Sequence, residues 1–386
     1  MARLLHVIAT TDPATGGPIE GLRQRAEALR RMGHETQVVC CDTPESPWLT
    51  DQSLPILALG PGRGRFGFTP NLVPWLLAHA GEFDYVVVNG IWQYNSLGTR
   101  KAMLRLGKPY VVFTHGMLDP WFKRAYPFKH LKKWLYWPWG DYRVLRDAAA
   151  VLFTSDEERV LARQSFWLYR AKERVVHYGT GGPAGEAKAQ VEAFEDRFPE
   201  LQGRRFLLFL SRIHEKKGCD LLLRAFARLE DRDLRLVIAG PDQVGWVAEL
   251  QGLAQRLGVA DRVTWPGMLS GDLKWGAFQS CEAFVLPSHQ ENFGIVVAEA
   301  LACGKPVLIS NKVNIWREIE SAGAGLVAGD TQAGTDELLA RWTAMTAAER
   351  EAMTAKARPC FEANFEIEQA ARSLLQVLAE VVGPPK

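Results

Sequence analysis

The chain contains 386 residues, 47% of them hydrophobic and 23% charged, and at about 100–200 residues per domain this length predicts two domains with cores of their own. The 46 Lys and Arg residues nearly balance 44 Asp and Glu residues, so the composition excludes both a disordered chain and a wholly basic nucleic-acid-binding protein. No run approaches the roughly 18 consecutive apolar residues of a membrane-spanning helix, so we expect no such helix.

The six cysteines follow neither a CxxC nor a zinc-binding spacing, and several lie inside apolar runs. Free thiols in such places behave as small hydrophobic residues, which predicts a reducing, cytoplasmic compartment and no structural metal. The first apolar stretch is interrupted by His6 and lacks a cleavage site, so it predicts a strand rather than a signal peptide.

Short apolar runs alternate with helix-period segments twice along the chain. The predicted strands are 4–9, 36–40, 56–59, 85–88, 110–113 and 151–153, then 206–210, 234–239, 263–265, 283–286, 306–309 and 325–327. Continuous apolar runs are typical of parallel strands that are covered on both faces. The alternation therefore predicts two doubly wound α/β domains.

We place the first domain at 1–178 and the second at 204–364, with a glycine-containing, charged linker at 179–203 between them. An amphipathic helix and tail at 365–386 follow, and this helix can return to the first domain. Open α/β sheets bind ligands beyond the carboxyl ends of their strands, so we expect the site in a cleft between the domains.

The strongest chemical motif is the segment 289–304, between two predicted strands. Its helix, predicted from about 293 to 303, is apolar on every side except at Glu299, and a buried carboxylate needs a polar ligand or a fixed donor. Glu291 precedes this helix, and the N–H groups at the helix N-terminus, beside residues 292–294, favour an anion. The alternative is structural: Glu299 pairs with a neighbouring Arg or Lys, and Glu291 caps the helix.

Two further segments bring candidate residues to strand ends. Arg212 ends one strand and Lys217 begins the next helix, a spacing of two cations that suits a diphosphate, although such a turn can also be merely solvated. His115 follows the strand at 110–113, where an ordinary loop histidine is the alternative. Gly16 and Gly17 follow the first strand, and glycines there allow a backbone to approach a ligand closely.

Together these motifs resemble the retaining glycosyltransferases of family 4. The resemblance covers nearly the whole chain: a Gly-Gly turn at 16–17, His-Gly at 115–116, Arg-x4-Lys-Gly at 212–218 and Glu-x7-Glu at 291–299. It implies the GT-B fold, two Rossmann-like parallel-sheet domains that face a central cleft. It also implies retaining transfer of a hexosyl unit from a UDP- or GDP-sugar to a sugar or lipid-linked sugar hydroxyl, in polysaccharide or glycolipid synthesis.

The resemblance assigns roles to individual residues. Arg212 and Lys217 would bind the donor diphosphate, and Glu299 would accept from the ribose hydroxyls. Glu291 would hold the sugar hydroxyls, and His115 would contact the transferred sugar and phosphate from the facing domain. The remaining donor-binding positions, mostly through their backbone, would be Gly16, Gly17, Met268, Leu269, Asn292, Phe293, Gly294 and Ile295.

Four places depart from the family's pattern. Ser211 stands where a glycine usually precedes the arginine, and Asn292 replaces a commoner glycine. The segment 311–316 replaces a Gly-Gly loop, and Asn89 stands where relatives often place a histidine. The last two departures concern the acceptor rather than the reaction class.

Two other motifs imitate known sites. Residues 62–67 have the GxGxxG spacing, but the next strand ends in Asn89 rather than an acid, so we interpret them as a basic loop. Residues 231–233 read Asp-Arg-Asp, as in metal-binding sites of another glycosyltransferase fold, but they precede a strand instead of following one. We therefore interpret them as a turn and expect chemistry that needs no metal.

The segment Trp121–Arg146 carries seven Lys and Arg residues, several tryptophans and a single acid, Asp141. Aromatic rings among cations suit an anionic membrane surface, whereas domain packing beside a solvated face is the alternative. The first 178 residues hold 23 Lys and Arg against 16 Asp and Glu, and the remainder holds 23 against 28. Peripheral membrane association is therefore an expectation. The alternative functions are a GT-B-type nucleotide-sugar epimerase and a non-catalytic nucleotide-sugar-binding protein.

Overall fold

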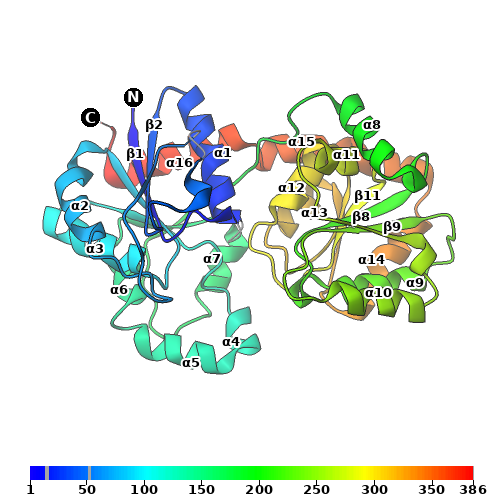
Figure 1. Cartoon of the computed structure of the whole chain (residues 1–386), viewed down its shortest axis with the longest axis horizontal. Helices are drawn as coiled ribbons and strands as arrows, with labels where there is room; N and C mark the ends of the chain where they lie inside the picture. Colours follow the sequence, from blue (N-terminus) through cyan, green and yellow to red (C-terminus); the bar gives the residue numbers. More distant parts are fainter. Residues whose placement is uncertain (14–16, 51–53, 386) are drawn as a thin grey trace. The chain divides into compact units, whose positions relative to one another are not determined.

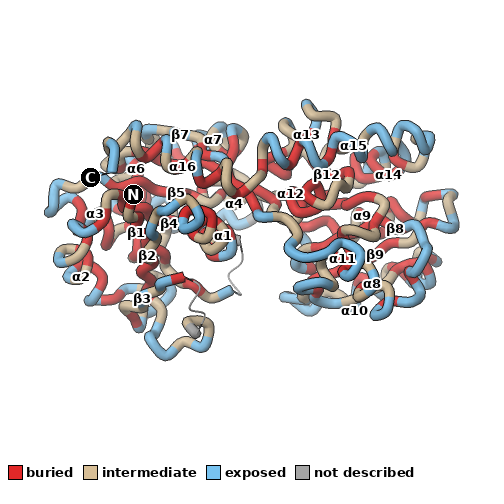
Figure 2. Tube along the Cα trace, turned by 90° about the horizontal axis from the view of Figure 1, so that it is seen from above, coloured by how far each residue is buried: buried red, intermediate tan, exposed pale blue. Residues whose placement is uncertain are grey.

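The computed structural model describes residues 1–13, 17–50 and 54–385. The contacts divide the chain into two compact units: Met1–Gly179 together with Ile367–Lys386, and Thr180–Glu366 (Figure 1). In each unit the buried residues follow the strands, while the outer faces of the helices are exposed (Figure 2).

The first unit is built on a parallel sheet of seven strands in the order β3-β2-β1-β4-β5-β6-β7. The strands are β1 Arg3–Ile8, β2 Glu35–Cys40, β3 Ile56–Ala58, β4 Tyr85–Asn89, β5 Val111–Phe113, β6 Ala150–Phe153 and β7 Glu173–Val175. Six of them match the predicted runs to within about a residue at each end, whereas β7 was missed because this short edge strand has no apolar run.

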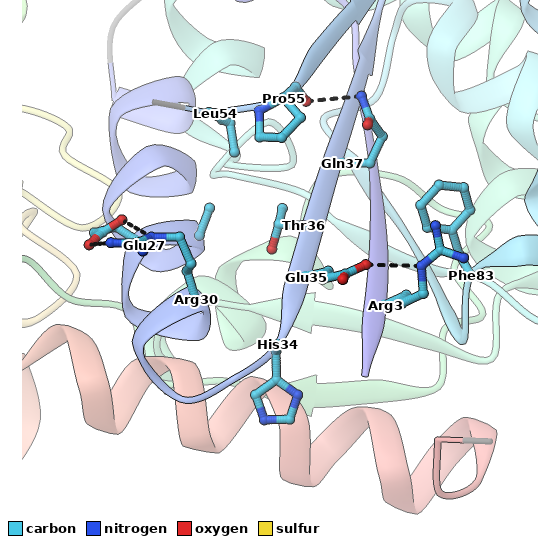
Figure 3. Close-up of a pocket in the computed structure, with 11 residues that line it drawn as sticks. Arg3, Glu27, Arg30, His34, Glu35, Thr36, Gln37, Leu54, Pro55 and Phe83 are labelled. Atoms are coloured by element: carbon cyan, nitrogen blue, oxygen red, sulfur yellow. Dashed lines mark hydrogen bonds and ion pairs between the residues drawn. The ribbon is translucent and has the colours of Figure 1, made fainter. Parts of the chain in front are cut away.

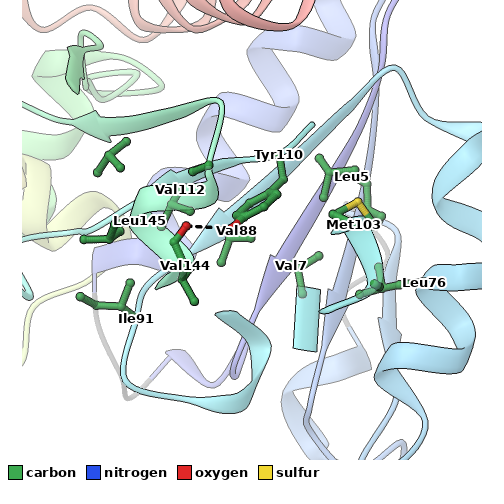
Figure 4. Packing of buried hydrophobic residues seen from close by; sticks show 14 of the residues in the cluster. Leu5, Val7, Leu76, Val88, Ile91, Met103, Tyr110, Val112, Val144 and Leu145 are labelled. Atoms are coloured by element: carbon green, nitrogen blue, oxygen red, sulfur yellow. Dashed lines mark hydrogen bonds between the residues drawn. The ribbon is translucent and has the colours of Figure 1, made fainter. Parts of the chain in front are cut away.

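Eight α-helices of the described residues accompany this sheet: α1 Gly17–Arg31, α2 Leu72–His79, α3 Tyr94–Leu106, α4 Trp121–Ala125, α5 Pro127–Tyr136, α6 Asp141–Asp147, α7 Asp156–Ala162 and α16 Ile367–Val382. Successive residues of a strand point to opposite faces, and both faces are covered here. Leu5 and Val7 pack with Met103 of α3 and Val144 of α6 (Figure 4). Leu4 packs on the other face with Leu374 of α16.

The return of the C-terminal helix to the first unit is thereby confirmed. The apolar stripe of α16 includes Leu374 and Leu378, and both join the cluster that contains Leu4 and Tyr85. The Tyr85 hydroxyl also donates to the carbonyl oxygen of Gly383 at 2.9 Å.

The second unit has a six-stranded parallel sheet in the order β10-β9-β8-β11-β12-β13. The strands are β8 Phe206–Leu210, β9 Arg235–Ala239, β10 Val263–Gly267, β11 Ala283–Leu286, β12 Val307–Ser310 and β13 Gly325–Ala328. The helices are α8 Ala187–Arg197, α9 Cys219–Ala227, α10 Val247–Arg256, α11 Gly271–Ser280, α12 Ile295–Ala302, α13 Trp316–Ala322, α14 Gln332–Ala344 and α15 Ala347–Asn364. Both sheets are doubly wound, so the predicted α/β class is confirmed.

The segment 179–203 is not the linker that the sequence predicts. Residues 180–203 belong to the second unit and contain α8. This helix buries Gln190 and Phe194 against α11, where a Cβ on Gly276 would lie 2.0 Å from the Gln190 carbonyl oxygen. Most of its exposed positions are charged, and that composition concealed the narrow buried face from sequence analysis.

Across the described ranges, none of the helices combines the length and the hydrophobicity needed to span a bilayer.

Candidate functional site

The sheet of the second unit has its switch point between β8 and β11, where the strand order reverses. In open α/β sheets a crevice for ligands lies outside the carboxyl ends of the strands at that point. The loop after β8 carries Arg212 and Lys217, and the loop after β11 carries Glu291. The topology therefore brings residues about eighty positions apart to one edge of one sheet.

Lys217 and Glu291 form an ion pair at this edge, in which the Lys217 ammonium donates to the Glu291 carboxylate. Lys217 is only 4% exposed, whereas the Glu291 side chain is 22% exposed. Gly218 follows with φ of 67°, and a Cβ there would lie 2.4 Å from the Pro287 carbonyl oxygen. The glycine is needed because the two loops touch backbone to backbone.

The loop after β12 fixes the position of Glu291. The Glu291 amide donates to the Lys312 carbonyl oxygen at 2.9 Å, and the Asn314 amide donates to the Glu291 carbonyl oxygen at 3.0 Å. Asn314 is buried, and its side-chain amide is 3.5 Å from the Asn292 side-chain oxygen. The segment 311–316, which departs from the family's pattern, therefore supports the loop that carries Glu291. Sequence analysis did not identify this role.

The start of α12 presents backbone rather than side chains. The Phe293 ring is buried and packs edge-on against Phe365, with ring centroids 5.8 Å apart. Gly294 has φ of 73° and caps the helix, which begins at Ile295 instead of at the predicted 293. A Cβ on Gly294 would lie 3.2 Å from Glu291 Cγ, so a side chain there would displace the acid.

Glu299 is 4% exposed on α12, and its carboxylate accepts from the Lys274 ammonium at 2.8 Å. The fixed donor expected for the Glu299 carboxylate is therefore Lys274 of α11. This agrees with the structural alternative, in which Glu299 pairs with an Arg or Lys. Sequence reasoning did not find Lys274, because it lies 25 positions earlier on a different helix. Its ammonium also lies 4.1 Å from the centroid of the Trp275 ring.

The other predicted donor-binding positions lie on the neighbouring loops. Arg212 is exposed, and its guanidinium donates to the Gln243 side-chain oxygen, in the loop after β9, at 3.3 Å. Met268 is 71% exposed and Leu269 is buried, directly after β10. Gly16 lies outside the described residues.

In the first unit, three polar side chains meet at the carboxyl edge of the sheet. Asn89, which ends β4, lies between two histidines: its side-chain oxygen is 3.2 Å from His115 Nε2, and its nitrogen is 3.2 Å from His6 Nδ1. Asn89, where relatives often place a histidine, is thus the centre of a hydrogen-bonded row. His6 was treated in the sequence as an interruption of a strand, so its part in this row was not predicted.

Burial, together with the nearby Arg25 guanidinium, lowers the pKa of both His6 and His115 to about 3. Both imidazoles are therefore neutral at pH 7. The Arg25 guanidinium lies 4.9 Å from the centroid of the Phe113 ring and 4.7 Å from that of Tyr178. The His115 ring stacks on Phe113 at 5.3 Å.

The backbone at His115 is held in an uncommon conformation, with φ of 48°. Buried Glu158 of α7 fixes this turn by accepting from the Thr114 hydroxyl at 2.8 Å and from the Gly116 amide at 2.6 Å. Its other oxygen accepts from the Thr154 amide and hydroxyl, each at 2.7 Å. His115 is therefore placed by a carboxylate that lies 43 positions further along the chain.

A pocket of about 240 Å³ lies elsewhere in the first unit, where β1 and β2 begin (Figure 3). Its charged side chains pair with one another, as in Arg3 with Glu35 at 3.1 Å and Arg30 with Glu27 at 2.8 Å. It lies at the amino ends of these strands, opposite to the edge that carries His115. We therefore do not assign it to the candidate site.

The Asp-Arg-Asp segment forms the turn that its position predicted. Asp231 accepts from the backbone amides of Asp233 and Leu234 at 3.1 and 3.2 Å, and it also pairs with Arg205 at 3.0 Å. Its carboxylate is thus used to close the turn before β9.

Sequence models of two glycosyltransferase families match this chain. "Glycosyl transferase 4-like domain" matches residues 16–179, and "Glycosyl transferases group 1" matches residues 191–358. The D-inositol 3-phosphate glycosyltransferase of Actinosynnema mirum is 33% identical over 237 residues, which cover 56% of this chain and 54% of that protein. The same enzyme of Salinispora tropica is 30% identical over 211 residues, covering 52% and 43%. The matched region spans about half the length of these curated relatives.

Solved structures with the same architecture cover nearly the whole chain. HepE of Anabaena, in complex with UDP and glucose, has a TM-score of 0.79 at 18% identity, over 98% of this chain and 100% of that one. Sucrose-phosphate synthase of Thermosynechococcus elongatus has a TM-score of 0.76 at 21% identity, over 98% and 99%. At these identities the likeness shows the fold. The two family models together span most of the chain, which therefore belongs to the group 1 glycosyl transferases and has the GT-B fold.

Proposed function

We propose that this protein transfers a hexosyl unit from a nucleotide-diphosphate sugar to a hydroxyl of a sugar or of a lipid-linked sugar, with retention of anomeric configuration. The observation that carries the proposal is the buried Lys217–Glu291 pair at the switch point of the second sheet, beside the N-terminus of α12. A cation, a carboxylate and the N-terminus of a helix there match a leaving diphosphate and a neutral sugar.

The leaving diphosphate would be stabilised by Lys217, Arg212 and the amides at the start of α12. Charge that develops on the departing oxygen is best stabilised by donors that are already in place, and Lys217 is fixed by burial and by Glu291. We propose that these groups act without a metal ion.

Retention would follow from attack on the face that the diphosphate leaves. The bond from the anomeric carbon to the diphosphate oxygen breaks, the acceptor oxygen bonds to that carbon, and the acceptor proton passes to the diphosphate. Glu291 is engaged by Lys217, which favours a positioning role for it over that of a covalent nucleophile. Neutral His115 would position the sugar through a hydrogen bond rather than through charge.

We propose UDP-sugars as the first donors to test, because HepE is described in complex with UDP and glucose, with GDP-sugars next. The named relatives are D-inositol 3-phosphate glycosyltransferases, so a phosphorylated polyol belongs among the acceptors tried. All six cysteines are free thiols, which supports a cytoplasmic location.

The test is incubation of the protein with UDP- and GDP-sugars, with and without acceptors, followed by NMR of the product's anomeric proton. The proposal expects release of nucleoside diphosphate and a product with the anomeric configuration of the donor. Lys217→Ala and Arg212→Ala should each remove most of the turnover while the protein still folds. A new nucleotide sugar without acceptor would indicate an epimerase, and binding without release would indicate a non-catalytic protein; either result overturns the proposal.

A further inference from the structure

Helix α5 carries its apolar side chains on the outside of the molecule. Phe128, Leu131 and Leu135 are 83%, 54% and 63% exposed. They are three and four positions apart, so they form one stripe along the helix. Trp139, just beyond the helix, is 72% exposed. A helix on the surface of a soluble domain normally turns such a stripe toward the core.

The opposite face of α5 explains this orientation. His130 stacks on Phe166 with ring centroids 4.9 Å apart, and the Lys133 ammonium lies 4.3 Å from the centroid of the Trp92 ring. Trp137, directly after the helix, is fully buried and stacks on Phe166 with ring centroids 4.2 Å apart. These aromatic contacts hold the helix with its apolar stripe outward, at the edge of the first unit (Figure 1).

The surroundings of the stripe are positively charged. Lys123, Lys129 and Lys132 are exposed, and α5 contains no acidic residue. The one acid of the segment 121–146, Asp141, is buried and accepts from the Ser96 hydroxyl at 2.8 Å. The surface around the stripe therefore offers cations without competing carboxylates from its own segment.

We propose that the outer face of α5, with Trp139, docks on the surface of an anionic lipid bilayer. Apolar side chains would enter the boundary between headgroups and acyl chains, and the flanking lysines would reach lipid phosphates. Tryptophan prefers this interface because its ring is apolar while its N–H is polar. A second copy of the chain fits less well, since it would bring one set of lysines against another.

This docking goes beyond the proposed transfer and is independent of it, because lipid binding is measured without donor or acceptor. The probe is co-sedimentation with vesicles of phosphatidylglycerol and phosphatidylcholine, compared with vesicles of phosphatidylcholine alone. The wild-type protein should bind the anionic vesicles at least about tenfold more tightly at low salt, and high salt should weaken this binding.

Two variants separate the contributions: Phe128→Ser with Leu135→Ser removes apolar area, and Lys129→Glu with Lys132→Glu reverses charge. Each should weaken binding by about tenfold or more. The matched control is Lys101→Glu with Leu104→Ser on α3, where Leu104 is 52% exposed and Lys101 is also exposed.

The control should bind as the wild type does, and the melting temperatures of all variants should show that they fold. Three results would overturn the proposal: no binding of the wild type to anionic vesicles, an equal loss in the control, or self-association without lipid that the Phe128→Ser, Leu135→Ser variant abolishes. The last result would assign the stripe to a protein interface instead.

Discussion

Replacing Glu291 by glutamine should lower stability, strengthen the binding of a nucleoside diphosphate and slow transfer, all in one variant. The substitution keeps the size of the side chain but leaves the buried Lys217 ammonium without its carboxylate. A diphosphate that reaches Lys217 would then no longer share it with an acid. The opposite signs of the effects on stability and on binding distinguish this prediction from a simple loss of structure.

The size of the expected loss of stability follows from the burial of the Lys217–Glu291 pair. Breaking a buried ion pair by removing one partner costs about 3–5 kcal/mol, and the partial exposure of Glu291 places this pair near the lower end, at about 3 kcal/mol. At about 2–4 °C per kcal/mol for a unit of this size, the melting temperature of the second unit should fall by about 6–12 °C. If UDP restores half of the lost stabilisation, its dissociation constant tightens about tenfold.

Thermal unfolding with and without UDP measures both effects. The control is Glu337→Gln, which removes a carboxylate from an exposed pair with Arg341 in the same unit, at 3.1 Å. Such a pair contributes about 0.3–0.5 kcal/mol, so this variant should melt within about 2 °C of the wild type. The reasoning is refuted if Glu291→Gln melts with the control, or if UDP shifts its melting temperature less than it shifts that of the wild type.

Three further predictions concern buried groups. Burial raises the pKa of Asp141 to about 6, so the free energy of unfolding should fall by about 3 kcal/mol as the pH rises from about 4 to 6. Asp141→Asn should flatten this part of a profile of stability against pH. The pKa of His6 is lowered to about 3, so stability is lost as the pH falls below about 6.5, and His6→Gln should move the midpoint of acid unfolding to lower pH, measured by circular dichroism. Gly294→Ala should cost about 1–2 kcal/mol for its positive φ and should weaken UDP binding in a thermal-shift assay, since the new Cβ would press on Glu291.

The second unit was the more predictable part of the chain. Its strands are continuous apolar runs, and its candidate residues follow them directly, so sequence position sets their place at the sheet edge. Lys217 and Glu291 could be assigned to one site because both follow strands of one parallel sheet. That they pair could not be predicted, because the contact depends on how closely the two loops approach, which Gly218 permits.

The partners of these residues were less predictable than the residues themselves. Lys274 looks like an ordinary lysine in a helix, and nothing in its neighbourhood marks it as the donor to Glu299. Asn314 lies in a loop that the family's pattern does not contain, so that pattern could not assign it a role. A motif predicts where chemistry is placed, whereas its supporting contacts come from tertiary packing.

The first unit shows the same limit more strongly. His115 was identified from its strand end, but Asn89, His6 and Arg25 complete its surroundings from β4, β1 and α1. Each is isolated in the sequence among apolar or charged neighbours. A buried histidine inside a strand is the signal that could have led to them, because an imidazole needs a hydrogen-bond partner when it is removed from water.

Positive and negative charges nearly balance in the whole chain, but its lysines lie in two different environments. Lys217 is buried and paired, so its ammonium is held in position to bind one anion. Salt screens the attraction between a buried charge and its ligand only weakly. Lys129 and Lys132 are exposed beside apolar side chains, an arrangement that attracts an extended anionic surface and loses its attraction as the Debye length shortens. Ionic strength should therefore separate the two: raising it should release the protein from anionic vesicles well before it weakens the hold on a nucleoside diphosphate. If both were lost together, Lys217 would be acting as an exposed charge, contrary to its burial.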